Sequence, residues 1–93
     1  MEPKLSPVLH NLSVQRFELN VDGATAVAEY QRADDHVIFT HTLVPPELRG
    51  KGLAESLART ALDWARVEKL KVVPQCTYIA RFIEHHQEYR DLL

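Results

Sequence analysis

A glycine-bearing turn carries the residues of this sequence that are best placed to do chemistry. It reads Leu48-Arg49-Gly50-Lys51-Gly52-Leu53-Ala54 and lies between a strand-like segment and a long helical pattern. Glycines let backbone N–H groups approach an anion without a Cβ in the way, and the first N–H groups of a helix have no partner within it. Arg49 and Lys51 add two positive charges. We therefore interpret the turn as a binding site for a diphosphate.

Two better-known phosphate loops do not fit this turn. A P-loop requires Gly-x-x-x-x-Gly-Lys-Ser/Thr, a run that the sequence lacks. A dinucleotide-binding loop would have a third glycine where Glu55 stands, and it would need a larger sheet. The spacing that does occur is Arg-x-x-Gly-x-Ala, at Arg49, Gly52 and Ala54. An ordinary helix-start turn that binds nothing is the alternative.

Cys76 and His41 are side chains with nucleophilic and basic potential. Cys76 is expected just before a helix, whose N-terminus lowers the pKa of a thiol and raises its thiolate fraction. The predicted strand puts His41 on one face with Val37, Phe39 and Leu43, where an imidazole would act as a general base. Both have a structural alternative, because free cysteines often pack as small hydrophobes and a histidine on an apolar face is commonly a core residue.

Size and composition limit the classes of function. Ninety-three residues make one domain, and 45% apolar with 26% charged residues is typical of a globular protein. A net charge of −2 argues against general nucleic-acid binding. The sequence has neither a membrane-length apolar run nor a signal-peptide layout. Its single cysteine favours a reducing, cytoplasmic location. His85-His86 alone makes a poor metal site, so no metal is expected, and we expect a monomer or weak dimer.

The elements before the turn are predicted to be strands. Residues 1–12 contain two prolines and no clean periodicity, which predicts a loose lead-in ending in a turn at His10-Asn11, followed by a single domain over 13–93. Alternating or apolar runs predict strands at 14–19, 24–31 and 36–44. Asp22-Gly23 is a strong hairpin signal. The short connections favour an antiparallel meander.

The elements after the turn alternate between helix and strand. An apolar stripe predicts a helix from Glu55 to Lys69, residues 70–74 form a short strand, and a last helix covers 77–86 before a frayed or docked tail. A right-handed crossover makes the short strand parallel to the strand before the turn. The predicted fold is α/β, with a mixed sheet of about four strands and two helices in the order β-β-β-α-β-α.

With these elements in place, three segments resemble the single-domain, minimal branch of the GCN5-related N-acetyltransferase family. They are the hairpin Arg16 to Gly23, the run from His41 to Ala54, and Val73-Pro74-x-Cys76-x-Tyr78. The resemblance covers roughly residues 10–92. The helices between the first two strands and the C-terminal strand pair of larger members are missing, and these parts usually shape the acceptor pocket. Position 40, commonly acidic in the minimal branch, is Thr40.

The resemblance implies acetyl-CoA as the cofactor. In the family, the strand before the turn splays from its neighbour and its backbone bonds the pantetheine arm. That role would fall on Thr42, Leu43 and Val44, for which plain sheet pairing is the alternative. The diphosphate would be bound by the turn, at Arg49, Gly50, Lys51, Gly52, Leu53 and Ala54.

The resemblance also implies catalytic roles. Cys76 would take the acetyl group as a thioester, and His41 would act as base for the amine or the thiol. Tyr78 would protonate the departing CoA thiolate, as a tyrosine in the last helix does in larger members, or would pack on Phe82.

We therefore expect an acetyl-CoA-dependent N-acetyltransferase acting on a small or flexible amine, directly or through acetyl-Cys76. The acceptor could be a small molecule, a polyamine, a lysine or a protein N-terminus. The alternatives are a CoA-binding or protein-interaction module without catalysis, and a structural domain whose turn binds nothing.

Overall fold

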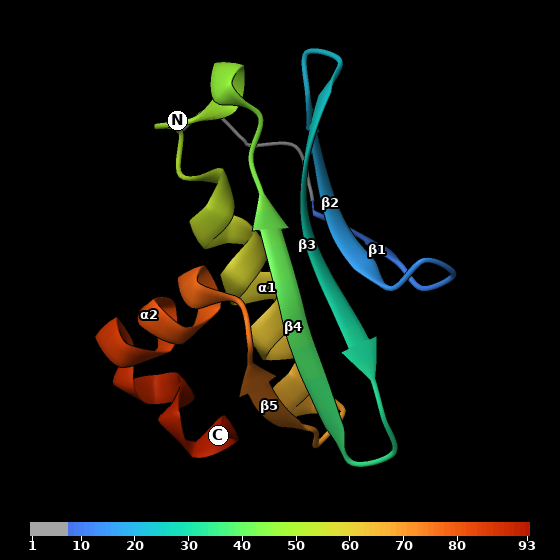
Figure 1. The fold of residues 1–93 in the computed structure, drawn as a ribbon, viewed down its shortest axis with the longest axis vertical. Helices are drawn as coiled ribbons and strands as arrows, with labels where there is room; N and C mark the ends of the chain where they lie inside the picture. Colours follow the sequence, from blue (N-terminus) through green and yellow to red (C-terminus); the bar gives the residue numbers. More distant parts are fainter. Residues whose placement is uncertain (1–7) are drawn as a thin grey trace.

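A mixed sheet forms the frame of the molecule (Figure 1). The computed structural model describes residues 8–93. The sheet order is β1-β2-β3-β4-β5, antiparallel except for the parallel pair β4–β5. The strands are β1 (Leu9–Asn11), β2 (Arg16–Val21), β3 (Ala24–Arg32), β4 (His36–Leu43) and β5 (Lys71–Pro74). The helices are α1 (Leu53–Val67) and α2 (Thr77–His85), with 3₁₀ segments η1 (Pro46–Leu48) and η2 (Gln87–Leu92). The α/β fold and its element order are confirmed, with one strand more than expected.

β1 has no counterpart among the strands predicted from the sequence. Leu9–Asn11 pairs with Arg16–Glu18 of β2, where a loose lead-in with a turn at His10-Asn11 is predicted, and the turn follows the strand instead. His10 stacks on Phe17 with ring centroids 4.1 Å apart and shares a hydrogen bond of 2.5 Å with the Tyr30 hydroxyl. Three residues are too few for periodicity to reveal a strand. The lead-in predicted for residues 1–7 lies outside the described residues.

One face of the sheet carries the core. Phe17 and Leu19 of β2, and Ala26 and Ala28 of β3, are buried there within a single apolar cluster that also includes residues of both helices. The two alanines leave room for α1 to lie close to β3, as their alternation predicts. The tail is docked rather than frayed, since Tyr89 in η2 is buried. No helix of residues 8–93 is long and apolar enough to span a membrane.

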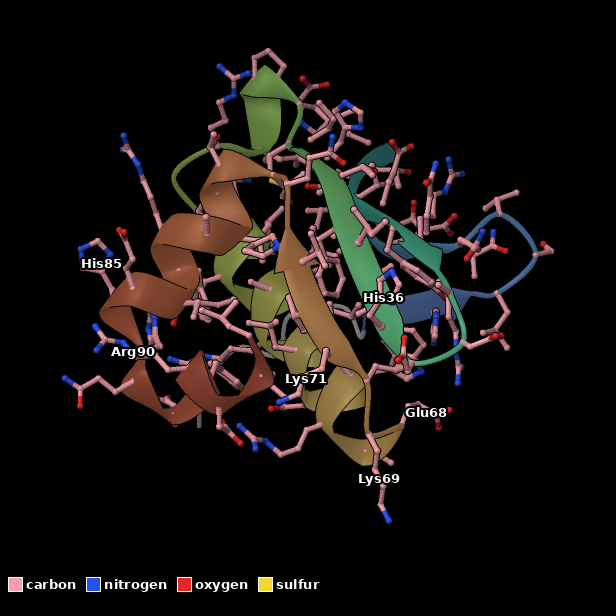
Figure 2. The ribbon with its side chains drawn as sticks, turned by 60° about the horizontal axis from the view of Figure 1, so that its bottom comes forward. His36, Glu68, Lys69, Lys71, His85 and Arg90 are labelled. Atoms are coloured by element: carbon pink, nitrogen blue, oxygen red, sulfur yellow. The ribbon has the colours of Figure 1, made fainter. Side chains whose placement is uncertain are left out.

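α1 begins and ends two residues earlier than predicted. Beyond its last residue, Lys69 adopts a left-handed φ of 60°. The Leu70 N–H donates to the Ala65 carbonyl at 2.9 Å, and the Lys69 N–H donates to the Arg66 carbonyl at 3.1 Å. These two bonds form a Schellman motif, which satisfies carbonyls that a helix end otherwise leaves free. Glu68, Lys69 and Lys71 lie together at this connection (Figure 2).

A β-bulge in β4 decides which face its last residues occupy. Glu29 pairs with His41, but the next pair along β4 involves Phe39, so Thr40 is an extra residue. Side chains alternate along a strand, and the insertion moves His41 to the outer face and Thr42 to the inner face. The prediction that His41 shares a face with Phe39 is therefore wrong. The His41 side chain is 67% exposed.

The parallel pairing of β4 and β5 stops before β4 does. It ends at Phe39 and Pro74. The Cys76 N–H still donates to the Phe39 carbonyl at 2.8 Å, and the chain then turns into α2. β4 continues to Leu43 with no strand beside it on that edge among the described residues. An opening between the end of β4 and α2 follows from this geometry.

Candidate functional site

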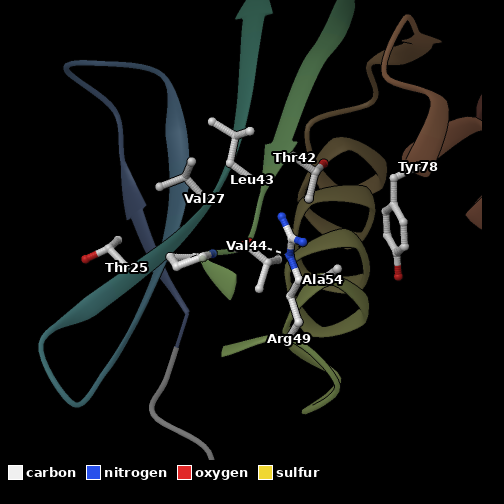
Figure 3. A pocket seen from close by; sticks show the side chains of 9 residues that line it. Thr25, Val27, Thr42, Leu43, Val44, Arg49, Ala54 and Tyr78 are labelled. Carbon is white, nitrogen blue, oxygen red and sulfur yellow. Dashed lines mark hydrogen bonds between the residues drawn. The ribbon is translucent and has the colours of Figure 1, made fainter. Parts of the chain in front are cut away.

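A pocket of about 560 Å³ lies at the free end of β4 (Figure 3). Its wall combines strands, turn and both helices: Thr25, Val27, Thr42, Leu43, Val44, Pro45, Arg49, Ala54 and Tyr78. A second pocket of about 230 Å³ lies over the start of α1, lined by Val44, Leu48, Arg49, Gly50, Gly52, Leu53, Ala54, Glu55 and Tyr78. The two share four wall residues and therefore form a continuous depression from β3 to the head of α1.

The start of α1 presents free backbone amides. Gly50 and Gly52 have left-handed φ angles of 82° and 77°, and a Cβ at either position would meet open space. The first helical amide with an acceptor is that of Ser56, which donates to the Gly52 carbonyl at 3.1 Å. Within residues 8–93 the amides of residues 50–55 have no hydrogen-bond acceptor. Free amides at a helix N-terminus, together with the helix dipole, are the kind of donors that can bind an anion.

Arg49 joins the turn to the end of β4. Its Nε donates to the Val44 carbonyl at 3.2 Å, and its guanidinium lies between Val44 and Ala54 (Figure 3). This places a positive charge where the two pockets meet. Lys51, by contrast, is exposed and lines neither pocket. The two cations predicted for the turn are therefore not equivalent.

Tyr78 lines both pockets from the first turn of α2. Burial, with smaller contributions from the charges of Glu55 and Cys76, raises the pKa of its phenol. The hydroxyl therefore stays protonated at neutral pH. The ring also packs near Phe82, with centroids 6.2 Å apart, so contact with Phe82 and exposure to the pocket occur together.

Cys76 lies behind the pocket wall. It is buried, 8% exposed, and its thiol donates to the Thr42 hydroxyl at a sulfur–oxygen distance of 3.4 Å. Its neighbour Thr42 lines the larger pocket and Cys76 itself does not. Cys76 therefore lies beside the end of β4, in contact with Thr42.

His41 is not brought together with Cys76. Thr42, which contacts the thiol, points to the inner face, whereas His41 points to the outer face. There its Nδ1 lies 3.6 Å from Oε1 of Glu29. His41 is thus neither a core histidine nor a partner of the thiol.

Three wall residues are absent from the predicted site. Thr25 and Val27 of β3 and Pro45 after β4 line the larger pocket. Val27 pairs with Leu43, so the β3–β4 register would have indicated it. That register depends on the position of the bulge, which alternation alone does not reveal.

Comparisons with known proteins identify the family of the chain. The family profile described as GCN5-related N-acetyl-transferase matches residues 16–92. Protein NATD1 of Mus musculus is 32% identical over 82 residues, covering 85% of this chain and 74% of that protein, and Protein NATD1 of Danio rerio is 31% identical over 87 residues, covering 88% and 79%. The NMR structure of a GCN5-like protein from Staphylococcus aureus aligns with a TM-score of 0.73 at 25% identity, covering 92% of this chain and 85% of that one. The chain therefore belongs to the GCN5-related N-acetyltransferase family.

Proposed function

We propose that the protein binds acetyl-CoA at the head of α1 and transfers its acetyl group to an amine. The observation that carries this proposal is the row of free amides at residues 50–55, beside Arg49 and open to a pocket. Backbone donors at a helix N-terminus suit the oxygens of a diphosphate. Family membership supports the choice of acetyl-CoA among diphosphate ligands.

The pantetheine arm would run through the larger pocket. The edge of β4 next to α2 lacks a strand partner there, so the backbone groups of residues 42–43 that point away from β3 are available to an extended ligand. Val44 has fewer free backbone groups for the ligand, because its carbonyl already accepts a hydrogen bond from Arg49. The apolar wall made by Val27, Leu43 and Ala54 suits the methylene groups of the arm.

Transfer would be direct. Bound acetyl-CoA supplies a thioester carbonyl, the amine nitrogen forms a C–N bond to it, and the C–S bond breaks. Tyr78, whose raised pKa keeps the phenol protonated until the reaction, gives its proton to the departing thiolate. His41, on the outer face beside Leu43, accepts the proton that the amine loses. Solvent then returns a proton from the imidazolium to the phenolate.

A route through acetyl-Cys76 receives less support. The Cys76 thiol is buried, bonded to Thr42 and absent from the pocket wall. An acetyl group on this sulfur would have to displace Thr42.

A second candidate function is a CoA-binding module without catalysis. Among the described residues, the wall of the 560 Å³ pocket includes neither a carboxylate nor an imidazole, so no strong base faces the expected position of the thioester. On this alternative CoA binds but acetyl transfer is absent.

Thermal unfolding with CoA and intact mass with acetyl-CoA test these alternatives. CoA at about 100 times its dissociation constant should add about 2.7 kcal/mol to the free energy of unfolding. With an amine panel, direct transfer predicts acetylated amine and protein of unchanged mass. A stoichiometric acetyl adduct that is lost in Cys76→Ala would instead establish the covalent route. Stabilisation without turnover would favour the module, and no stabilisation would contradict the proposal.

A further inference from the structure

A polar pocket on the outer face of the sheet shares no wall residue with the two pockets proposed for CoA. Its volume is about 380 Å³. The wall is built by the β1–β2 turn and the bulged region of β3 and β4: Val14, Gln15, Glu29, Tyr30, Gln31, Thr40 and His41. Because side chains alternate along β3, Glu29 lies on the same face as Thr25 and Val27 of the larger pocket.

The outer-face pocket and the larger pocket occupy neighbouring rows of side chains. Val27 pairs with Leu43 in one row, and Glu29 pairs with His41 in the next. Rows on one face are two residues apart along the strand, roughly 7 Å. A small extended molecule on this face can therefore contact both pockets at once.

Hydrogen bonds at the bulge hold the wall in place. Gln15 has a left-handed φ of 54°. Its backbone carbonyl accepts from the Tyr30 N–H at 3.1 Å, and its side-chain carbonyl accepts from the Arg32 N–H at 2.9 Å. Across the bulge, the Thr40 hydroxyl donates to the Glu29 carbonyl at 3.3 Å. The turn and the two strands are thereby fixed relative to one another, and the pocket is a feature of the fold.

Glu29 gives this pocket its charge. Its carboxylate, 39% exposed, lies 3.6 Å from the His41 imidazole, which is a cation only when protonated. Arg16 is opposite Glu29 in the sheet, but its Nε binds the Glu18 carboxylate at 2.6 Å. Among the wall residues of the described chain there is no lysine or arginine. With His41 neutral, the Glu29 carboxylate therefore suits an ammonium group from a ligand.

We propose that this pocket is the acceptor site and that the acceptor is a short aliphatic diamine or polyamine. One ammonium binds the Glu29 carboxylate, and the second amine, neutral when it reacts, reaches the thioester in the row of Leu43. A neutral diol of equal length fills the same space but brings no ammonium to the carboxylate. Acetylation of the bound amine rests on the acetyltransferase function proposed above, whereas binding of the amine in this pocket does not.

The test is an NMR titration of ¹⁵N-labelled protein with putrescine and with the neutral isostere butane-1,4-diol, in the presence and absence of saturating CoA. We expect shifts of the amides of Glu29, Thr40 and His41. Putrescine should bind about tenfold more tightly, the order expected of one charge-assisted hydrogen bond. Glu29→Gln should abolish this preference and leave the stabilisation by CoA unchanged.

Glu18→Gln is the matched control. It removes the same charge from the same face, but the Glu18 carboxylate is already held by Arg16 at 2.6 Å and Asn11 at 3.1 Å. The preference for putrescine should survive in this variant. Equal binding of putrescine and butane-1,4-diol, or a preference that survives Glu29→Gln, would overturn the acceptor proposal. Absence of stabilisation by CoA would count against the proposed function alone, because the titration without CoA still tests the pocket.

Discussion

The two ends of α1 differ in how their backbone groups are satisfied. At the C-terminal end, the amides of Glu68, Lys69 and Leu70 all donate to carbonyls of the helix. Side chains add further contacts, with Arg66 bound to Asp91 at 2.7 Å. At the N-terminal end, the amides of residues 50–55 have no acceptor within the described chain.

Both ends use left-handed residues, but for different purposes. Lys69 adopts the left-handed conformation, which is unfavourable for a residue with a Cβ. This conformation allows the two hydrogen bonds of the Schellman motif to form. Gly50 and Gly52 take the same conformation, but within the described residues their N–H groups have no acceptor. The comparison teaches that one end of the helix is closed by its own backbone, whereas the other leaves donors free for the anion that we propose it binds.

The largest expected effect is at Gly52. Gly52→Val puts a β-branched side chain at φ 77° and over the free amides, so it should raise the dissociation constant for CoA at least tenfold, about 1.4 kcal/mol. Calorimetric titration measures this. Gly23→Val, in the β2–β3 hairpin at φ 82°, is the matched control and should lose stability but keep CoA affinity. Equal loss of affinity in both variants would show that backbone strain, and not the amide site, is responsible.

A smaller effect is expected at Arg49. Arg49→Ala removes a charge at the junction of the two pockets and should weaken CoA binding about fivefold to tenfold, as for one charge-assisted hydrogen bond. Lys51→Ala removes an equal charge from the same turn but from outside both walls, so a change below about threefold is expected. Equal effects of the two variants would mean that only general electrostatic attraction operates.

A substitution at the C-terminal end of α1 should change the stability of the protein but not its affinity for CoA. Lys69→Gly relieves the left-handed conformation and should raise the free energy of unfolding by about 0.5–1 kcal/mol, measured by urea denaturation. CoA affinity should not change. A loss of stability would show that the Lys69 side chain matters more than its backbone.

The smallest effect concerns His10, which packs against Trp64 between the two ends of α1 at a centroid distance of 4.9 Å. Burial lowers the pKa of His10 below its ordinary 6.5, with Glu68 opposing the shift. The unfolded chain therefore binds the proton first as pH falls, and stability is lost below about pH 6.5. Urea denaturation between pH 7 and pH 5 should show this slope, and His10→Gln should reduce it. An unchanged slope would assign the pH dependence to other groups.

Much of the fold follows from local signals in the sequence. Strand alternation, Asp22-Gly23 and the apolar stripe of α1 each act over a few residues, and each predicted element is present. The turn at Arg49–Ala54 was predictable for the same reason, because glycine spacing and a helix start are local features. The sequence predicts six binding residues in this turn, and all of them except Lys51 line one of the two pockets.

The outer-face features were not predictable in this way. The bulge at Thr40 depends on how β3 and the Gln15 turn meet β4, which are contacts between segments distant in the sequence. One inserted residue moves His41 to the other face and brings Thr42 to Cys76. β1 cannot be predicted from alternation of polar and apolar residues within three positions. It is held in place by His10, which stacks on Phe17 and is hydrogen-bonded to Tyr30.

The most direct test of the central claim is a ¹H–¹⁵N titration of the protein with CoA. If the free amides at the head of α1 bind the diphosphate, the largest shifts will fall on residues 50–55, while Lys69 and Leu70 at the other end of the same helix will not move. Binding of CoA with these amides unperturbed, or shifts centred elsewhere, would contradict the account.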